Sequence, residues 1–322
     1  MTKKVALIIA YFGTLPPYSK FFFHSLKFNP EVDVILITDQ EVSISLDNLI
    51  VIKKEFNELK DDIQKLFDFE IVLDTPYKLC DYKTVYGMLL EENLTNYDFW
   101  GYCDMDMVLG DILSFLPEDI LNEYDKLYEY GHLTLYRNTL ENNRRFMQDA
   151  GMDYKKVFTT PVIKVFDEVE GIQDKYEKLG IPTYKYRDCA DISPWQYQFR
   201  RVESNLNEID LLGFNYQNQL FFWENGIIYR AYINRKKEVS YDTFNYLHFQ
   251  KRNLEDKFGL SENTESFFIT NKGFVSKELG FNVTVEQINQ LNPYSLFKEI
   301  EKRLSYFKFI WIRRFKKYIL NR

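Results

Sequence analysis

The sequence is poor in the residues that form most zinc and disulfide sites. It has three cysteines and three histidines among 322 residues. The cysteines are odd in number and widely spaced, which argues against a disulfide framework or a zinc site and fits a reducing compartment. With so few histidines, a metal site with several histidine ligands is not expected.

Long hydrophobic runs and glycine-rich phosphate loops are also missing. No run of 18 apolar residues exists, so no transmembrane helix is expected. The opening MTKKVALIIAYFG has a short apolar run and no small-residue cleavage site, so we interpret it as a first strand and not as a signal peptide. Without a Walker or dinucleotide loop, any phosphate would have to be held by a metal and by side chains.

Aromatic residues and an uneven charge distribution are what the chain has instead. Phe, Tyr and Trp make up 17% of it, which suits a large core and a pocket lined with rings. The net charge is −7, but residues 298–322 contain nine Lys/Arg and two Glu and so carry +7, leaving −14 for the rest. A basic tail on an acidic body suggests an anionic partner for the tail.

Three apolar runs near the N-terminus predict neighbouring strands of a parallel sheet. Residues 5–10, 32–38 and 50–53 alternate with helical patterns, which favours a sheet with helices on its faces. In such sheets ligands bind at the carboxyl ends of the strands. The residues that follow the first two strands fall at that edge: Tyr11, Phe12 and Asp39.

The stretch YDFWGYCDMDMVLGD, residues 97–111, is the most informative in the chain. A buried strand runs here into two carboxylates, Asp104 and Asp106. Buried charge is costly unless it is paired or bound to a metal. If the strand pattern continues, both side chains point to one side, where two oxygen ligands would suit Mg²⁺ or Mn²⁺. The alternative is a turn in which the carboxylates accept backbone N–H bonds.

Two further stretches contain polar residues, and each set of residues has two possible interpretations. Residues 76–93 predict a loop followed by a helix, with Asp81 and Lys83 at its start. They either solvate the helix end or face the site and help to hold a nucleotide sugar. In FNYLHFQKR, His248 comes shortly before Lys251 and Arg252. It is either structural or part of a diphosphate site, where cationic donors are needed.

The C-terminal residues 295–322 predict a basic amphipathic helix. Apolar residues recur at helical spacing and Lys or Arg fill much of the remainder. Such a helix suits an anionic membrane surface. The alternative is a final helix packed on the body or on another subunit.

Taken together, VALIIAYFG, KLCDYKTVYG, DFWGYCDMDMVLGDI and LHFQKR resemble bacterial glycosyltransferases of the GT-A fold. The likeness is nearest to those of capsule, lipopolysaccharide or other cell-surface polysaccharide clusters. It covers residues 3–140 well and 241–252 in outline. It implies an α/β, Rossmann-like, mostly parallel sheet flanked by helices in 1–255. By elimination we place the acceptor side at roughly 150–235, and the residue pattern predicts a helical extension over 256–322.

The resemblance also implies a site and its partners. The donor would be a nucleotide-diphosphate sugar, with UDP as the expected nucleotide, and the acceptor a saccharide or lipid-linked saccharide. No nucleic acid is expected, and the enzyme would be cytoplasmic, at the inner face of the membrane. Mn²⁺ or Mg²⁺ would be held by Asp104, Asp106 and His248. The donor would contact a wider set: Tyr11, Phe12, Asp39, Asp81, Lys83, Asp104 and Lys251.

The sequence leaves the catalytic base and the reaction class open. An inverting enzyme needs a carboxylate to deprotonate the acceptor hydroxyl, and four residues could supply it: Asp167, Glu168, Asp188 and Asp191. A retaining enzyme might need no such base. A sugar-phosphate nucleotidyltransferase is one alternative, although such enzymes usually have a glycine-rich loop after the first strand. A non-catalytic carbohydrate-binding protein is another, and an intact Asp-x-Asp argues against it.

Overall fold

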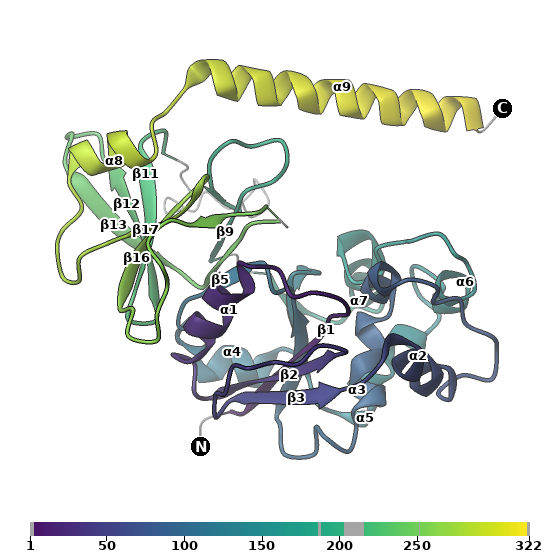
Figure 1. Cartoon of the computed structure of the whole chain (residues 1–322). Coiled ribbons are helices and arrows are strands. Elements are labelled where there is room, and N and C mark those ends of the chain that lie inside the picture. The colour runs from purple at the N-terminus through teal and green to yellow at the C-terminus, as the bar shows by residue number, and fades with distance from the viewer. Residues whose placement is uncertain (1–2, 186–187, 203–215, 251, 321–322) are drawn as a thin grey trace. The chain divides into compact units, whose positions relative to one another are not determined.

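The computed structural model describes residues 3–185, 188–202, 216–250 and 252–320, with the backbone alone for 313–320. The chain forms two compact units (Figure 1). The first unit consists of Met1–Ser19, Leu26–Met105 and Ile112–Tyr186. The second consists of Lys20–Ser25, Asp106–Asp111 and Arg187–Arg322.

A seven-stranded, mostly parallel sheet forms the centre of the first unit, in the order β3-β2-β1-β4-β7-β6-β8. Its strands are β1 Val5–Ala10, β2 Val32–Thr38, β3 Leu49–Lys53, β4 Phe99–Cys103, β6 Lys126–Tyr130, β7 Leu133–Arg137 and β8 Thr183–Tyr184. The first two strands have the predicted bounds, which confirms the reading of continuous apolar runs as buried parallel strands.

The register of β1, β2 and β4 places their carboxyl ends at one edge. Val5 lies opposite both Val32 and Phe99, and all three strands run parallel. The residues that follow these strands therefore leave the sheet on the same side. Among the described residues of this unit, the α-helices are α2 Phe56–Gln64, α3 Tyr86–Leu89, α4 Glu118–Glu123, α5 Leu140–Asn143, α6 Tyr154–Phe158 and α7 Asp174–Lys178. The sequence thus predicts the mixed α/β class correctly.

Residues 76–93, predicted to be a loop and then a helix, form a chain of tight turns. Two 3-10 segments, Pro76–Asp81 and Lys83–Val85, precede the four-residue helix α3. Tertiary contacts hold these turns. Lys78 Nζ donates to the carbonyl oxygens of Val157 and Val162 at 3.1 and 3.0 Å. In a regular α-helix, Lys78 would point in a different direction and could not reach these two carbonyl oxygens.

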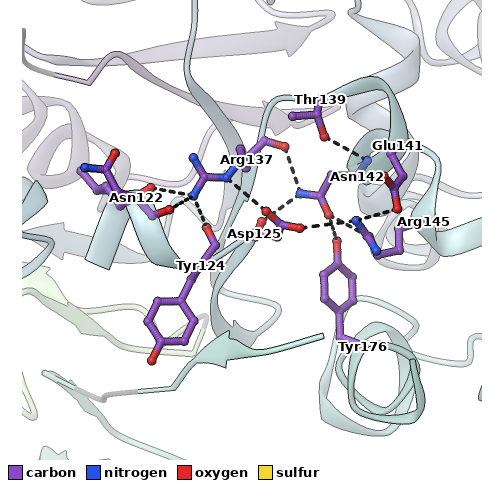
Figure 2. Close-up of polar contacts among 10 residues, drawn as sticks. Asn122, Tyr124, Asp125, Arg137, Thr139, Glu141, Asn142, Arg145 and Tyr176 are labelled. Atoms are coloured by element: carbon purple, nitrogen blue, oxygen red, sulfur yellow. Dashed lines mark hydrogen bonds and ion pairs between the residues drawn. The ribbon is translucent and has the colours of Figure 1, made fainter. Parts of the chain in front are cut away.

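A buried polar network supports the hairpin of β6 and β7 (Figure 2). Asn142 Nδ2 donates to the carbonyl oxygens of Asp125 and Arg137 at 2.8 and 2.9 Å. Asn142 Oδ1 accepts from Arg145 Nε at 3.1 Å and from the Tyr176 hydroxyl at 2.6 Å. One side chain thus ties the hairpin to α5 and α7, and all of its bonding capacity is used.

Two antiparallel-rich sheets form the second unit. The smaller has the order β10-β9-β14-β5 and the larger β13-β12-β11-β16-β17-β15. The smaller sheet contains β5 Met107–Leu109, β9 Cys189–Asp191, β10 Arg200–Arg201 and β14 Tyr246–His248. The larger contains β11 Gln219–Glu224, β12 Ile227–Ile233, β13 Val239–Phe244, β15 Glu255–Asp256, β16 Ser266–Thr270 and β17 Gly273–Ser276.

Aromatic residues fill the core of the second unit. Trp223 is fully buried, donates its indole N–H to the carbonyl oxygen of Leu109 at 3.0 Å and stacks on Phe267. Helix α1, Ser19–Leu26, adds Phe21, which stacks on Phe274 with ring centroids 3.6 Å apart. These contacts account for much of the high aromatic content.

The last part of the chain holds more than helices. Residues 256–322, predicted to be a helical extension, also contain β16 and β17, which pair with each other and with β11 of the larger sheet. Two helices follow them: α8 Val285–Leu291 and α9 Leu296–Leu320. Within the described ranges, none of the helices combines the length and the apolar character needed to span a bilayer.

The Asn142 network yields a first prediction. Asn142→Ala should lower the free energy of unfolding by about 2–4 kcal/mol, because two buried carbonyls and two buried donors would lose a partner. Urea unfolding followed by circular dichroism measures this. Asn122→Ala, at an exposed position of α4, is the matched control and should stay within about 0.5 kcal/mol of wild type. Equal midpoints for the two variants would show that the network contributes little.

Candidate functional site

The loop after β1 is fastened to the end of β2. Gly13 N donates to Asp39 Oδ1 at 2.9 Å, and Gly13 has a φ of +90° that an L side chain rarely adopts. The Gln40 side chain and the Gly13 N–H lower the pKa of Asp39, so this carboxylate stays ionised. Tyr11 and Phe12, which precede Gly13, are half-buried. The Phe12 ring packs edge-on against Phe56.

A lysine between two carboxylates forms the centre of the site in the first unit. Lys83 Nζ donates to Asp104 Oδ1 at 2.8 Å and to the carbonyl oxygen of Gly131 at 2.8 Å. It also pairs with Asp167 Oδ2 at 3.0 Å. The structure thus brings together Lys83, Asp104 and Asp167, which the sequence separates by up to 84 positions. Asp104 follows β4 directly and is the most exposed of the three.

Burial and charge compete in this cluster. Burial lowers the pKa of Lys83, but the carboxylates of Asp104 and Asp167 outweigh it and hold this pKa well above the ordinary value. Burial raises the pKa of Asp167, against the effect of Lys83. We take Lys83 to be fully charged, because it has two carboxylate partners. Its charge makes the burial of the carboxylates tolerable.

Glu168 lies next to this cluster without an ion pair among the described residues. Burial raises its pKa to about 7, and the charge of Asp167 adds to the effect. A carboxyl that titrates near neutral pH is suited to accept a proton from a hydroxyl group. Among the four candidate bases, Glu168 is the one whose pKa is raised to about 7.

The turn between β6 and β7 shapes the pocket of the two acids. A Cβ at Gly131 would lie 2.4 Å from Asp167 Oδ2 and 2.9 Å from Glu168 Oε1. Both distances are shorter than van der Waals contact, so a Cβ at this position would have to displace the ends of both acidic side chains. Gly131 is not among the residues predicted from the sequence, although a Tyr-Gly-His turn between two strands is a signal for such a position.

Asp81 does not belong to this cluster, and the prediction that it contacts the donor needs correction. Its side chain is fully buried and pairs with Lys78 at 2.6 Å. It also accepts the backbone N–H groups of Lys164 and Phe166 at 3.0 and 2.9 Å. These bonds use its acceptor sites. Asp81 instead anchors the loop that leads into Asp167.

The second unit contributes a histidine between two carboxylates. His248 Nε2 lies 3.5 Å from Asp106 Oδ1, and His248 Nδ1 lies 3.5 Å from Asp191 Oδ1. Strand pairing positions all three: His248 of β14 lies opposite Met107 of β5 and beside Asp191 of β9. The fold thus explains why a histidine far along the chain meets the acidic motif.

Burial lowers the pKa of His248, but the bonds and charges of Asp106 and Asp191 outweigh it and raise this pKa to about 10. Gln250 Nε2 donates to Asp191 Oδ2 at 2.6 Å and fixes that carboxylate. A histidine that binds a metal usually gives its other ring nitrogen to a carboxylate. Asp191 is therefore better suited to orient the His248 ring than to act as a base.

The remaining predicted residues divide as follows. Asp188, a candidate base, pairs with Arg201 at 2.7 Å, which suits a structural role. Arg252 donates to the carbonyl oxygens of Ser193 and Gln196 and so holds a loop. Lys251 lies outside the described residues.

Asp104, Asp106 and His248 each offer a ligand atom to a group that could hold a metal ion. Asp104 and Asp106 are separated by Met105 alone, so the chain itself keeps their Cα atoms within about 7 Å. Two carboxylates and one imidazole are a donor set that suits Mn²⁺ and also accepts Mg²⁺. The residues present therefore fit the metal that the sequence predicts.

Two solved structures that are slightly similar to this chain are glycosyltransferases. One is mouse xyloside xylosyltransferase 1 in its apo form, with a TM-score of 0.36 and 9% identity over 60% of this chain and 88% of that chain. The other is the apo-form glycosyltransferase GlyE of Streptococcus pneumoniae TIGR4, with a TM-score of 0.27 and 10% identity over 48% of this chain and 42% of that chain. The likeness is slight in both cases.

Similarity at the level of sequence points to one family. The family described as "Family of unknown function (DUF6625)" matches residues 7–278, which is most of the chain. No curated protein matches the chain. What the site does must therefore be argued from its own residues.

The Gly131 turn gives a second prediction. Gly131→Ala should lower the melting temperature, because overpacking a filled site costs about 1–3 kcal/mol and here displaces two carboxylates. Differential scanning calorimetry measures the change. Gly180→Asn is the control, since a Cβ there meets nothing within 4 Å and Asn tolerates its φ of +69°. An unchanged melting temperature in Gly131→Ala would mean that the acids do not pack against the turn.

Proposed function

We propose that this chain, which belongs to the family of unknown function DUF6625, is a metal-dependent glycosyltransferase that uses a nucleotide-diphosphate sugar. The observation that carries the proposal is the acidic pair at the end of β4. Asp104 is bonded to Lys83, and Asp106 lies beside His248. Carboxylates, a lysine and a histidine are the groups that bind a divalent cation and a diphosphate.

The sheet supports this assignment. Strands β1, β2 and β4 run parallel and end at one edge, where Asp39 and Asp104 follow β2 and β4. In open parallel sheets this edge is where nucleotides bind. We therefore propose the GT-A arrangement for the first unit, with Tyr11, Phe12 and Asp39 on the side of the base and ribose.

The described residues would divide the work on the donor. Asp104, Asp106 and His248, after loss of the His248 ring proton to solvent, would hold Mn²⁺ or Mg²⁺, which when bound neutralises charge on the diphosphate. Lys83 supplies a fixed cation beside Asp104. Asp191 orients His248 from the other side of its ring. The expected nucleotide is UDP, following the family resemblance.

The acceptor side would depend on Glu168. In an inverting transfer, the acceptor hydroxyl oxygen forms a bond to the anomeric carbon while the bond from that carbon to the diphosphate oxygen breaks. The hydroxyl proton passes to the Glu168 carboxylate, and the nucleoside diphosphate leaves with the bonding electrons. The acceptor would be a saccharide or a lipid-linked saccharide.

A sugar-phosphate nucleotidyltransferase would use a similar acidic site but form different products. It would release pyrophosphate from a nucleoside triphosphate and a sugar phosphate, whereas the proposed enzyme releases a nucleoside diphosphate from a nucleotide sugar. Incubation with UDP-sugars and Mn²⁺ should therefore release UDP. Release of pyrophosphate from UTP and a sugar 1-phosphate, without UDP from UDP-sugars, would favour the alternative.

Donor binding gives the third prediction. UDP with Mn²⁺ should raise the melting temperature more than UDP or Mn²⁺ alone, since a ligand that binds the folded state stabilises it by mass action. Asp106→Asn should abolish this joint shift, because an amide is a weak ligand for a hard cation. Asp47→Asn, at an exposed position, is the matched control and should keep the shift.

Two outcomes would contradict the metal-dependent reading. One is an equal joint shift in Asp106→Asn and in the Asp47→Asn control. The other is full UDP release in excess EDTA. If UDP, GDP and ADP all fail to stabilise the wild-type chain with Mn²⁺, the nucleotide-sugar donor itself is excluded.

The fourth prediction concerns the pH dependence of transfer. Glu168 must be ionised to accept a proton, and its pKa is raised to about 7. The value of kcat/KM should therefore rise with pH through about 7 and then level off. Glu168→Gln should lower kcat by about 10²–10⁴ and remove this rise. The matched control is Glu170→Gln, which changes an exposed residue two positions further along the chain. It should keep both the wild-type kcat and the wild-type pH profile. A retained profile in Glu168→Gln would assign the base elsewhere or indicate a retaining reaction.

A further inference from the structure

Helix α9 of the second unit has an exposed apolar stripe. Phe297, Ile300, Leu304, Phe307 and Trp311 follow each other at intervals of three and four residues, which places them on one face of a helix. Their exposed fractions are 77, 47, 62, 66 and 67%. Figure 1 shows α9, in yellow, as one continuous helix. We call these five residues the stripe. Exposed apolar surface of this kind usually marks an interaction site.

The opposite side of α9 contacts the rest of the second unit. Tyr306 and Phe309 lie against Trp195, with ring centroids 5.8 and 4.8 Å apart. Lys302 Nζ donates to the carbonyl oxygen of Pro194 at 3.0 Å. At 3.6 residues per turn, Lys302 and Phe309 lie nearly half a turn from the centre of the stripe. The helix is thus held by its other face, and the stripe is left exposed.

Glu299 also takes part in this attachment. Arg200 donates to Glu299 Oε2 at 2.6 Å, and Arg303 donates to Glu299 Oε1 at 3.2 Å. One of the two acidic residues between 298 and 322 is therefore paired with cations of the same unit. The nine Lys and Arg residues of this segment give it a net charge of +7. The segment that contains most of the stripe is therefore strongly basic in sequence.

We propose that α9 docks on an anionic lipid surface through the stripe. A helix in the plane of such a surface needs an apolar face with aromatic residues and flanking cations. The stripe supplies three aromatic side chains, and Lys308, which follows Phe307 directly, is exposed near its edge. The positive charge complements the negative charge of the headgroups. This inference is independent of the reaction that the enzyme catalyses.

A second copy of the chain fits the stripe less well. Pairing two such helices would bring together two segments of net charge +7, which repel each other. Helices that pair along a stripe of this spacing usually have Leu, Ile or Val in it, whereas three of these five residues are Phe or Trp. The observations therefore favour a lipid surface over a dimer.

Liposome flotation of the full chain tests the proposal. The chain should float with vesicles of phosphatidylcholine and phosphatidylglycerol at low salt, and much less with phosphatidylcholine alone or at high salt. The double variant Leu304→Ser/Phe307→Ser should lower the partition coefficient at least about tenfold, because burial of each apolar side chain is worth more than that factor. Lys308→Glu should also weaken binding, and only to the anionic vesicles.

A matched control separates the stripe from apolar exposure in general. Phe281→Ser removes a side chain that is 63% exposed outside α9 and should bind vesicles like wild type. Brominated lipids should quench part of the tryptophan fluorescence of wild type, and the quenching should disappear in Trp311→Phe. All of the variants change exposed residues, so the melting temperature should stay close to that of wild type.

Several results would overturn the proposal. One is no flotation of wild type with anionic vesicles at low salt. Another is equal flotation of the wild type and the Leu304→Ser/Phe307→Ser variant. A dimer in analytical ultracentrifugation that becomes a monomer in this variant, without vesicle binding by wild type, would assign the stripe to a second copy of the chain.

Discussion

The ion cluster of Lys83 with Asp104 and Asp167 is the interaction on which the first unit's site depends. Its three members come from a 3-10 segment, from the end of β4 and from a long loop. Removing the lysine would leave two buried or half-buried carboxylates without their cation, which is far costlier than losing a surface pair. The Lys83 bond to the carbonyl of Gly131 extends the same constraint to the β6–β7 turn. Charge pairing therefore fixes the relative positions of three segments that belong to different structural elements.

Packing on the far side of the turn makes this arrangement rigid. The hydroxyl of Tyr102 contacts both the Tyr136 hydroxyl and the carbonyl oxygen of Asp167, each at 3.1 Å. Lys83 Nζ lies 5.3 Å from the centre of the Tyr102 ring, within cation–π range. Asn142 ties the same hairpin to its helices. Tyr102 of the sheet thus contacts both the Asp167 backbone and Lys83. Asp81 holds the loop that carries Asp167. Precise placement of this kind is what a reacting site requires.

The sequence predicts best where a physical signal is continuous. VALIIA and VDVILIT gave strands with correct bounds because both faces of a central strand are buried, and the edge where β1, β2 and β4 end followed from their parallel direction. It predicts worst where tertiary contacts decide. Nothing local in KLCDYK shows that Asp81 turns into the core while Lys83, two residues on, meets Asp104. Nor does it show that Asp191 lies beside His248, because that neighbour relation arises only from the pairing of β9 with β14.

Asp104 and Asp106 stay close together because they are near neighbours in the chain, and not because of tertiary packing. Asp104 belongs to the first unit and Asp106 to the second, yet a single residue joins them. Side chains from distant segments meet only through tertiary packing, whereas this pair stays together through covalent geometry alone. Each carboxylate then has its own partner within its own unit, Lys83 for Asp104 and His248 for Asp106. The short spacing of the motif therefore keeps the two carboxylates close to each other, although each pairs with a residue from a different part of the chain.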